Sequence, residues 1–361
     1  MCERPADDGS RTHHAVERPG EPRRADGVDR RCTGGDEPGR TADGVDRRRA
    51  DGGTWRRRRA ISRRGLLVAT GVAVGLSTPV VGETDVADSA GEEPPLHVRV
   101  YAGPTPLHAR LRSGVSGVRT GWTEVHEAAI DAVEDALGQI ADYAAEHTDL
   151  GAFEYRVERH DPVGSRLGLA SPLDALTPAT TIYDRFRDVV HERDLVTGRC
   201  CHLLLWWDGL NYDVGYGGTR SPNSHVARVD GEGSQTVANV GATEFWDSRA
   251  VTRNIAIHET LHTFLSSSIV ETVIDSRCDH DLGTAVAVAD GVREVSPMAT
   301  AYAGPEGIGG GTRFHGTGCF DHDAFSRHDG IEGVDRWRYT TELSDATLEA
   351  VTRYVERYLL D

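Results

Sequence analysis

The hydrophobic positions in the first half of the folded region predict strands that alternate with helices. Residues 96–100 alternate between apolar and polar side chains and stop at Gly103-Pro104, which is typical of a half-buried strand. Apolar residues after Thr123, a good N-cap, recur at helical spacing and predict a long amphipathic helix over 124–146. Further elements are expected as strands at 153–158, 201–207 and 236–240 and as a helix at 181–192.

The pattern weakens in the second half, where two helices are expected among loops. A second long helix begins near Asp247 or Ser248 and carries apolar residues as far as Phe264. Glycine-rich loops follow, until Ser344 caps a terminal helix with one apolar face. The segment 211–229 is rich in Gly, Ser and Asn and predicts an irregular sheet edge. These patterns together indicate an α/β fold with a loop-rich C-terminal part that ends in a helix.

Composition adds a strong charge asymmetry. The chain has 361 residues, 38% of them hydrophobic, which is enough to bury a core. Its 57 acidic residues outnumber 40 basic ones, all of them arginine, so the net charge is −17. The part up to Arg64 carries a balance of +5 and the rest −22. The acidic body argues against binding nucleic acid or anionic membrane surfaces, and a lysine-free, acid-rich surface resembles proteins of halophilic archaea.

The first 82 residues differ from the rest of the chain. Residues 1–60 lack apolar periodicity and repeat the heptapeptide ADGVDRR at 25–31 and 42–48, which indicates a disordered leader or a misassigned start. In the segment 61–82, Arg63-Arg64 precede a mildly apolar run that is too short and polar for a membrane span and resembles a twin-arginine export signal. The expected organisation is completed by a linker at 83–94 and one folded domain at 95–361.

Export would place the mature chain outside the cytoplasm, in an extracellular or cell-surface location where disulfides persist. Four of the six cysteines follow the signal segment: Cys200, Cys201, Cys278 and Cys319. Because Cys200 and Cys201 are adjacent, they point to opposite faces of a strand. The favoured disulfide is Cys278 with Cys319.

The second long helix carries the sequence HETLH at 258–262, an HExxH motif. His258 and His262 are four residues apart, so both imidazoles project from one helical face and can bind one cation. Glu259 lies one residue further round, within reach of a metal-bound water. The motif therefore predicts a zinc site with Glu259 as general base.

A catalytic zinc needs a third protein ligand. The candidates downstream are Glu271, Asp275, His280, Asp281, His315, His322 and His328. Glu271 would resemble the ligand of glutamate zincins, but it lies only nine residues past His262. His280 is preferred because the serines at 266–268 and Gly283 allow a turn that brings it back beneath the metal. Asp279 and Asp281 are candidate partners for an imidazole N–H, and His322 is the reserve ligand.

The sequence SPMATAY at 296–302 resembles the methionine-containing turn of metzincin metallopeptidases. The resemblance covers roughly residues 96–302 and departs from the usual HExxHxxGxxH run, since Leu265 replaces the glycine and Ser268 the third histidine. It implies a metzincin-like mixed sheet with long helices, with His258, His262 and His280 as Zn²⁺ ligands. Met298 would form a hydrophobic floor under them.

The sequence therefore predicts an exported, halophile-type zinc metalloendopeptidase that hydrolyses peptide bonds, with Glu259 passing a proton from water to the leaving amine. Peptide or protein substrates would add as a strand at the edge region 211–229. Two alternatives stay open. One is a zinc amidase with a glutamate as third ligand, and the other is a secreted binding or surface protein whose metal is structural or whose site is inactive.

Overall fold

The computed structural model describes residues 94–151, 153–163, 177–195, 199–211, 213–220, 226, 233–302 and 324–360, without the side chains of 301 and 302. The chain divides into two units, Met1–Thr84 and Asp85–Asp361, and every described residue belongs to the second. The leader, the export signal, Cys319, His315 and His322 lie outside the described residues, as does much of the edge region 211–229.

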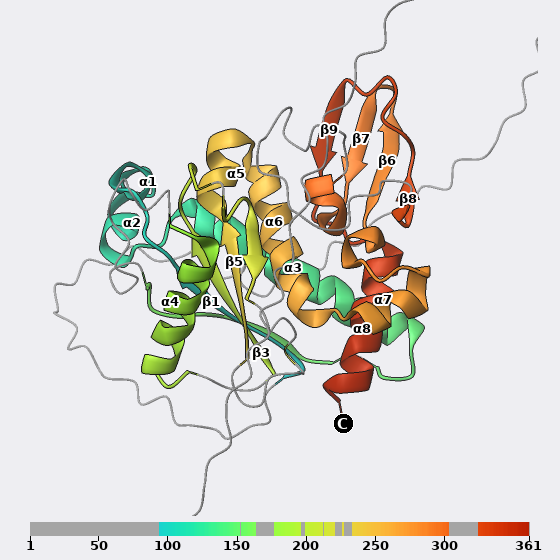
Figure 1. Ribbon diagram of the computed structural model, residues 1–361, viewed down its shortest axis with the longest axis horizontal. Coiled ribbons are helices and arrows are strands. Elements are labelled where there is room, and N and C mark those ends of the chain that lie inside the picture. Colours follow the sequence, from blue (N-terminus) through green and yellow to red (C-terminus); the bar gives the residue numbers. More distant parts are fainter. Residues whose placement is uncertain are drawn as a thin grey trace, which may run out of the picture. The chain divides into compact units, whose positions relative to one another are not determined.

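A five-stranded mixed sheet forms the centre of the second unit (Figure 1). Its strands are β1 (Leu96–Ala102), β2 (Tyr155–Arg159), β3 (Cys200–Trp206), β4 (Gly217–Thr219) and β5 (Ser234–Asn239). They lie in the order β2-β1-β3-β5-β4, and all neighbours are parallel except β4, which runs antiparallel to β5 at the edge. The predicted α/β class is confirmed.

Helices cover both faces of this sheet. The helices are α1 (Leu107–Arg112), α2 (Gly114–Thr120), α3 (Glu124–His147), α4 (Ala179–Glu192), α5 (Val240–Trp246), α6 (Arg249–Leu261), α7 (Ser267–Ile274) and α8 (Asp345–Tyr358). Helix α4 covers one face of the sheet, and α3 and α6 cover the other (Figure 1). The apolar side chains of α4 pack in one core cluster, and those of α3 and α6 pack in another. Strands β1 and β3 are therefore covered on both sides, as parallel strands usually are, and β1 is more buried than its alternation suggested.

The expected second long helix is two helices. Asn239 accepts a hydrogen bond from the Ala242 N–H, so α5 begins directly after β5. The helix α5 ends at Trp246 with Asp247 as its C-cap, and α6 begins after its N-cap Ser248. Helix α6 ends at Leu261, and a 3₁₀ turn, η3 (His262–Phe264), follows. The helix that carries the HExxH motif is thus shorter than the periodicity predicted.

The second half contains a second sheet where mostly loops were expected. Its strands are β6 (Thr284–Ala289), β7 (Val292–Val295), β8 (Arg327–His328) and β9 (Arg336–Tyr339), in the order β8-β6-β7-β9. Strands β6 and β7 form an antiparallel hairpin, while β8 and β9 are parallel to their neighbours. Two 3₁₀ turns, η4 (Asp279–Leu282) and η5 (Pro297–Tyr302), flank the hairpin. These strands have two to six residues, and only the four-residue β9 alternates polar and apolar side chains throughout.

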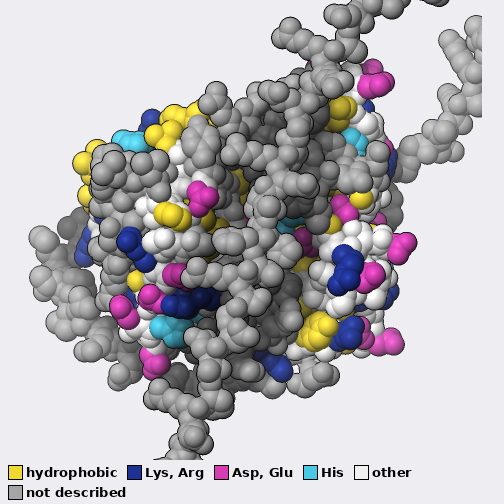
Figure 2. Space-filling view, in the orientation of Figure 1, with side chains coloured by type: hydrophobic (Ala, Val, Ile, Leu, Met, Phe, Trp, Pro, Cys, Tyr) yellow, Lys and Arg dark blue, Asp and Glu magenta, His cyan; other side chains and the backbone are white. Residues whose placement is uncertain are grey.

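Where Figure 2 shows described residues, acidic and arginine side chains lie next to each other at several places on the surface. None of the described helices has the length and apolar character needed to cross a membrane.

The start of α3 is fixed by a histidine in a position where a capping box usually has Glu or Gln. The Thr123 N–H donates to His126 Nδ1 over 3.1 Å. The ring is fully buried and stands edge-on to Trp122 and Trp207. Burial lowers the pKa of His126 to about 4, so the imidazole stays neutral and can accept.

The substitution His126→Gln is expected to reduce the loss of stability that the protein shows as the pH becomes acidic. An unfolded chain binds this proton near pH 6.5, whereas the folded chain resists it until about pH 4. Because of His126, the free energy of unfolding of the wild type therefore falls by about 3 kcal/mol as the pH decreases from 6.5 to about 4. Urea unfolding from pH 7 to pH 4 checks this, with His147→Gln at the exposed end of α3 as control. Parallel curves for wild type and His126→Gln would contradict the assignment.

Candidate metal centre

The end of α6 brings two imidazoles together, edge-on to each other. His258 lies in the last turn of α6, and His262 follows its final residue and opens η3. Their four-residue spacing places both rings on one side of the helix. The Nε2 atoms are 2.9 Å apart.

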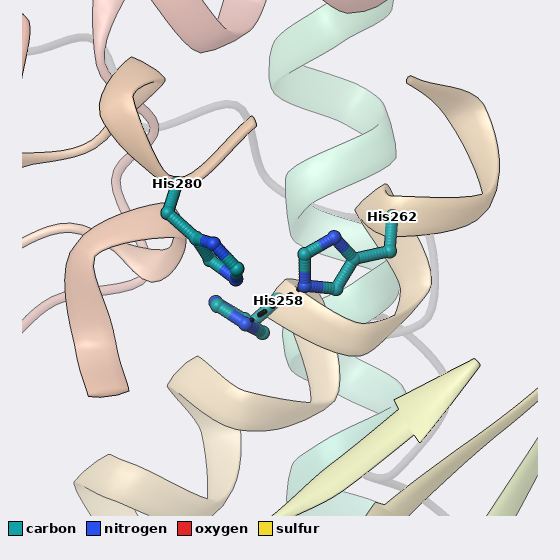
Figure 3. Close-up of side chains that lie close together, drawn as sticks. All are labelled: His258, His262 and His280. Atoms are coloured by element: carbon teal, nitrogen blue, oxygen red, sulfur yellow. Dashed lines mark hydrogen bonds between the residues drawn. The ribbon is translucent and has the colours of Figure 1, made fainter. Parts of the chain in front are cut away.

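A separate segment supplies the third imidazole. Helix α7 ends at Ile274, and the left-handed conformation of its C-cap Asp275 (φ 53°) lets the chain turn back. The turn η4 then carries His280 to the pair. The ring of His280 is stacked on that of His258 at 5.1 Å and lies edge-on to that of His262 at 4.9 Å. Figure 3 shows the three rings pointing toward a common centre. Their ligand atoms all lie within 4.8 Å of one another, so they could hold a metal ion.

Hydrogen bonds to the Nδ1 atoms of His258 and His262 determine that their Nε2 atoms face inward. His258 Nδ1 is 2.8 Å from the Pro297 carbonyl oxygen, and His262 Nδ1 is 2.6 Å from Asp279 Oδ2. Both partners can only accept, so both Nδ1 atoms carry hydrogen. Neutral rings in that tautomer would present two Nε2 lone pairs to each other at 2.9 Å. This arrangement requires a cation or a proton between them, and it matches metal-binding histidines held by a carbonyl or carboxylate.

The electrostatics of the site agree with this geometry. Burial and the neighbouring imidazoles lower the pKa of His258 well below its usual value, and burial lowers that of His280 to about 3. Burial also opposes charge on His262, but the Asp279 carboxylate outweighs it and raises the pKa of His262 to about 9. His258 and His280 thus remain neutral electron-pair donors, and in the absence of a metal His262 holds the bridging proton.

Glu259 follows His258 on α6, and its carboxylate is buried. Its Oε2 atom has no hydrogen-bond partner in the described part of the chain, and burial raises the pKa of Glu259 to about 7. The side chain packs against β4 at Gly217, where a Cβ would lie 2.7 Å from the Glu259 Cγ and Cδ atoms. Thr236 on β5 donates to the Glu259 carbonyl. A glycine is therefore required at 217 to let the edge strand approach the carboxylate.

The turn with Met298 lies against the site. Met298 is fully buried in the core, and η5 packs on both α6 and η4. Gly283, just after η4, approaches η5 so closely that a Cβ would lie 2.6 Å from the Ala299 Cβ. The contribution of η5 to the histidines is the Pro297 carbonyl, which sequence reasoning missed because a backbone acceptor has no residue signature.

Residues near the C-terminus hold η4 in place. The Leu282 carbonyl, at the end of η4, accepts hydrogen bonds from three hydroxyls, those of Ser326, Ser344 and Thr347. The Ser326 N–H also donates to the Asp281 carbonyl. Ser344 was predicted only as the cap of α8, which it is. Its second role, supporting the turn that carries His280, follows only from the fold.

The other candidates lie apart from the three imidazoles. Glu271 is exposed on α7 near Arg277, and it is absent from every described group that could hold a metal. Asp275 caps α7, while Asp281 accepts from Ser276. His328 on β8 accepts from the Gly330 N–H.

Cysteine 278 belongs to a second described metal-capable group with Asp279 and His280. It is disulfide-bonded, however, so it offers no thiolate. Its partner lies outside the described residues, and the pairing with Cys319 stays a prediction. Cys200 and Cys201 are buried on β3 and are not disulfide-bonded.

No protein family model and no curated protein sequence matches the chain.

Removing His280 is expected to abolish metal binding while removing Glu271 leaves it unchanged. His280→Ala deletes one of three converging donors, whereas Glu271→Ala deletes an exposed carboxylate. The measurement is bound Zn²⁺ per chain after dialysis against a trace of the metal. Full zinc occupancy in His280→Ala would contradict the ligand set, as would its loss in Glu271→Ala.

Asp279→Asn is expected to weaken metal binding roughly 10-fold to 100-fold, because the carboxylate orients His262 and makes it a stronger donor. Competition with a chromogenic chelator gives the affinity. Asp275→Asn makes the same chemical change at an exposed helix end and serves as control. Equal affinities in the two variants would show that Asp279 does not support the site.

Proposed function

We propose that the chain is a zinc-dependent metallopeptidase of the HExxH type, related in architecture to the metzincins, that hydrolyses peptide bonds. The observation that carries this proposal is the set of three imidazoles with inward-facing nitrogens beside the buried Glu259 carboxylate. The sheet with its antiparallel edge strand, the helix with HExxH and the buried Met298 turn support the family relationship.

The donor set fits zinc. Three imidazoles suit Zn²⁺, whereas Mg²⁺ and Ca²⁺ prefer oxygen ligands. His258, His262 and His280 would hold the ion, leaving a coordination position for water or substrate as catalytic zinc sites require. Bound zinc would supply a Lewis acid that makes water a better nucleophile and polarises the scissile carbonyl.

Glu259 performs the proton transfers. It is the residue after His258, and its free Oε2 makes it available to a water at the histidines. Glu259 takes a proton as the water attacks the carbonyl carbon and then hands it to the amine as the peptide bond breaks. Packing against Gly217 holds the carboxylate, and Asp279 holds the ring of His262 in orientation.

The edge strand β4 would bind the substrate. Among the described strands, β4 has a single neighbour, β5, so its other side offers backbone groups to an extended peptide. Gly217 lies in this strand, against Glu259. A peptide added along β4 would therefore pass the proton-transfer group.

The place of action is proposed from the sequence. Arg63-Arg64 and the apolar run after them support export by the twin-arginine route, and the −22 balance of the remaining chain supports work at high salt.

The substitution Glu259→Gln tests the proposal. The amide keeps the shape but cannot accept the proton, so casein hydrolysis should fall roughly 10²-fold to 10⁴-fold with zinc content unchanged. Glu271→Ala, on the exposed face of α7, is the control for both measurements. A zinc-loaded wild type that cleaves no member of a peptide library would refute the peptidase and favour a binding protein with a structural metal.

A further inference from the structure

Helices α1 and α2 expose an unusual number of aliphatic side chains. Four of the ten exposed large hydrophobic residues in the described part of the chain lie between 107 and 118. They are Leu107 (63% exposed), Leu111 (59%), Val115 (84%) and Val118 (40%). Single exposed aliphatics are ordinary, but a group on one protrusion indicates an interaction surface. We call these four residues with Arg112 and Arg119 the basic apolar patch.

The charge of this segment is opposite to that of the body. The chain has 57 acidic residues in 361, yet none falls between 94 and 123. Arg110 donates to the carbonyls of Gly117 and Val118, which ties α1 to α2. Arg112 and Arg119 have no acidic partner within 4 Å among the described residues, so their charge is available.

Two glutamates close to Arg112 contact a different arginine. A cavity of about 300 Å³ beside α1 is lined by Arg112 and also by Glu124 and Glu244. Both glutamates face the guanidinium of Arg249, Glu244 at 2.5 Å and Glu124 at 3.8 Å. Where α1 lies, Figure 2 shows hydrophobic, histidine and arginine side chains together, with no acidic side chain visible among them.

We propose that the basic apolar patch docks the protein on an anionic lipid surface. Aliphatic side chains enter the boundary between headgroups and acyl chains, while arginines pair with lipid phosphates. The arginines of the patch are attracted to an anionic bilayer, whereas the acidic remainder of the body is repelled by it, so contact would be confined to the acid-free segment 94–123. This docking is independent of the proposed peptidase activity, because the patch lies at the N-terminal end of α6 and the histidines at its C-terminal end.

The test is co-sedimentation of the full chain with phosphatidylglycerol vesicles and with phosphatidylcholine vesicles. Binding is expected to the anionic vesicles, with roughly 30-fold weaker partitioning for R112Q/R119Q and roughly tenfold or more for L111D. The control I331D places the same charge at an exposed aliphatic away from α1 and should bind like the wild type. All variants retain the same arginine-rich leader, so differences between them report the patch.

Hydrogen exchange locates the contact independently of any variant. Amides over 107–120 should gain protection when anionic vesicles are added. Protection confined to residues 1–64, equal binding of L111D and wild type, or equal binding to the two lipids would each overturn the proposal. Circular dichroism and zinc content show that a variant with lost binding is still folded.

Discussion

Two hydrogen-bond acceptors decide whether the three histidines can form a metal site. The Pro297 carbonyl and the Asp279 carboxylate each hold the outer nitrogen of one histidine, and together they force the inner nitrogens of His258 and His262 to 2.9 Å. The acceptors come from η5 and η4, whereas the histidines come from the end of α6. The site is therefore a property of three packed segments. A helix with HExxH alone would leave both rings free to rotate.

Long periodic elements and local motifs were predictable from the sequence, while short elements and backbone contacts were not. The helix α3 followed from its cap and apolar spacing, and the i, i+4 histidines followed from helical geometry. The strands of the second sheet are too short to show a period. Placing His280 beside the pair needed only a turn of sufficient length, which the segment after α6 provides.

Some features of the site leave no mark on the sequence. The Pro297 acceptor is a carbonyl that every residue has, and Gly217 matters through the side chain it lacks. Asp279 was expected as a partner of an imidazole, together with Asp281, and only the fold distinguishes them: Asp279 contacts His262, and Asp281 contacts Ser276. A whole-chain average can also hide a local feature: the net charge of −17 conceals the acid-free segment 94–123.

The hydroxyls on the Leu282 carbonyl relate the metal centre to the order in which the chain is made. His258 and His262 are synthesised well before Ser344 and Thr347, which hold the turn that carries His280. A nascent chain that ends before residue 344 has all three histidines but lacks that support. The full set of three hydroxyls on the Leu282 carbonyl therefore exists only after the last helix has been synthesised, whereas Ser326 is available earlier.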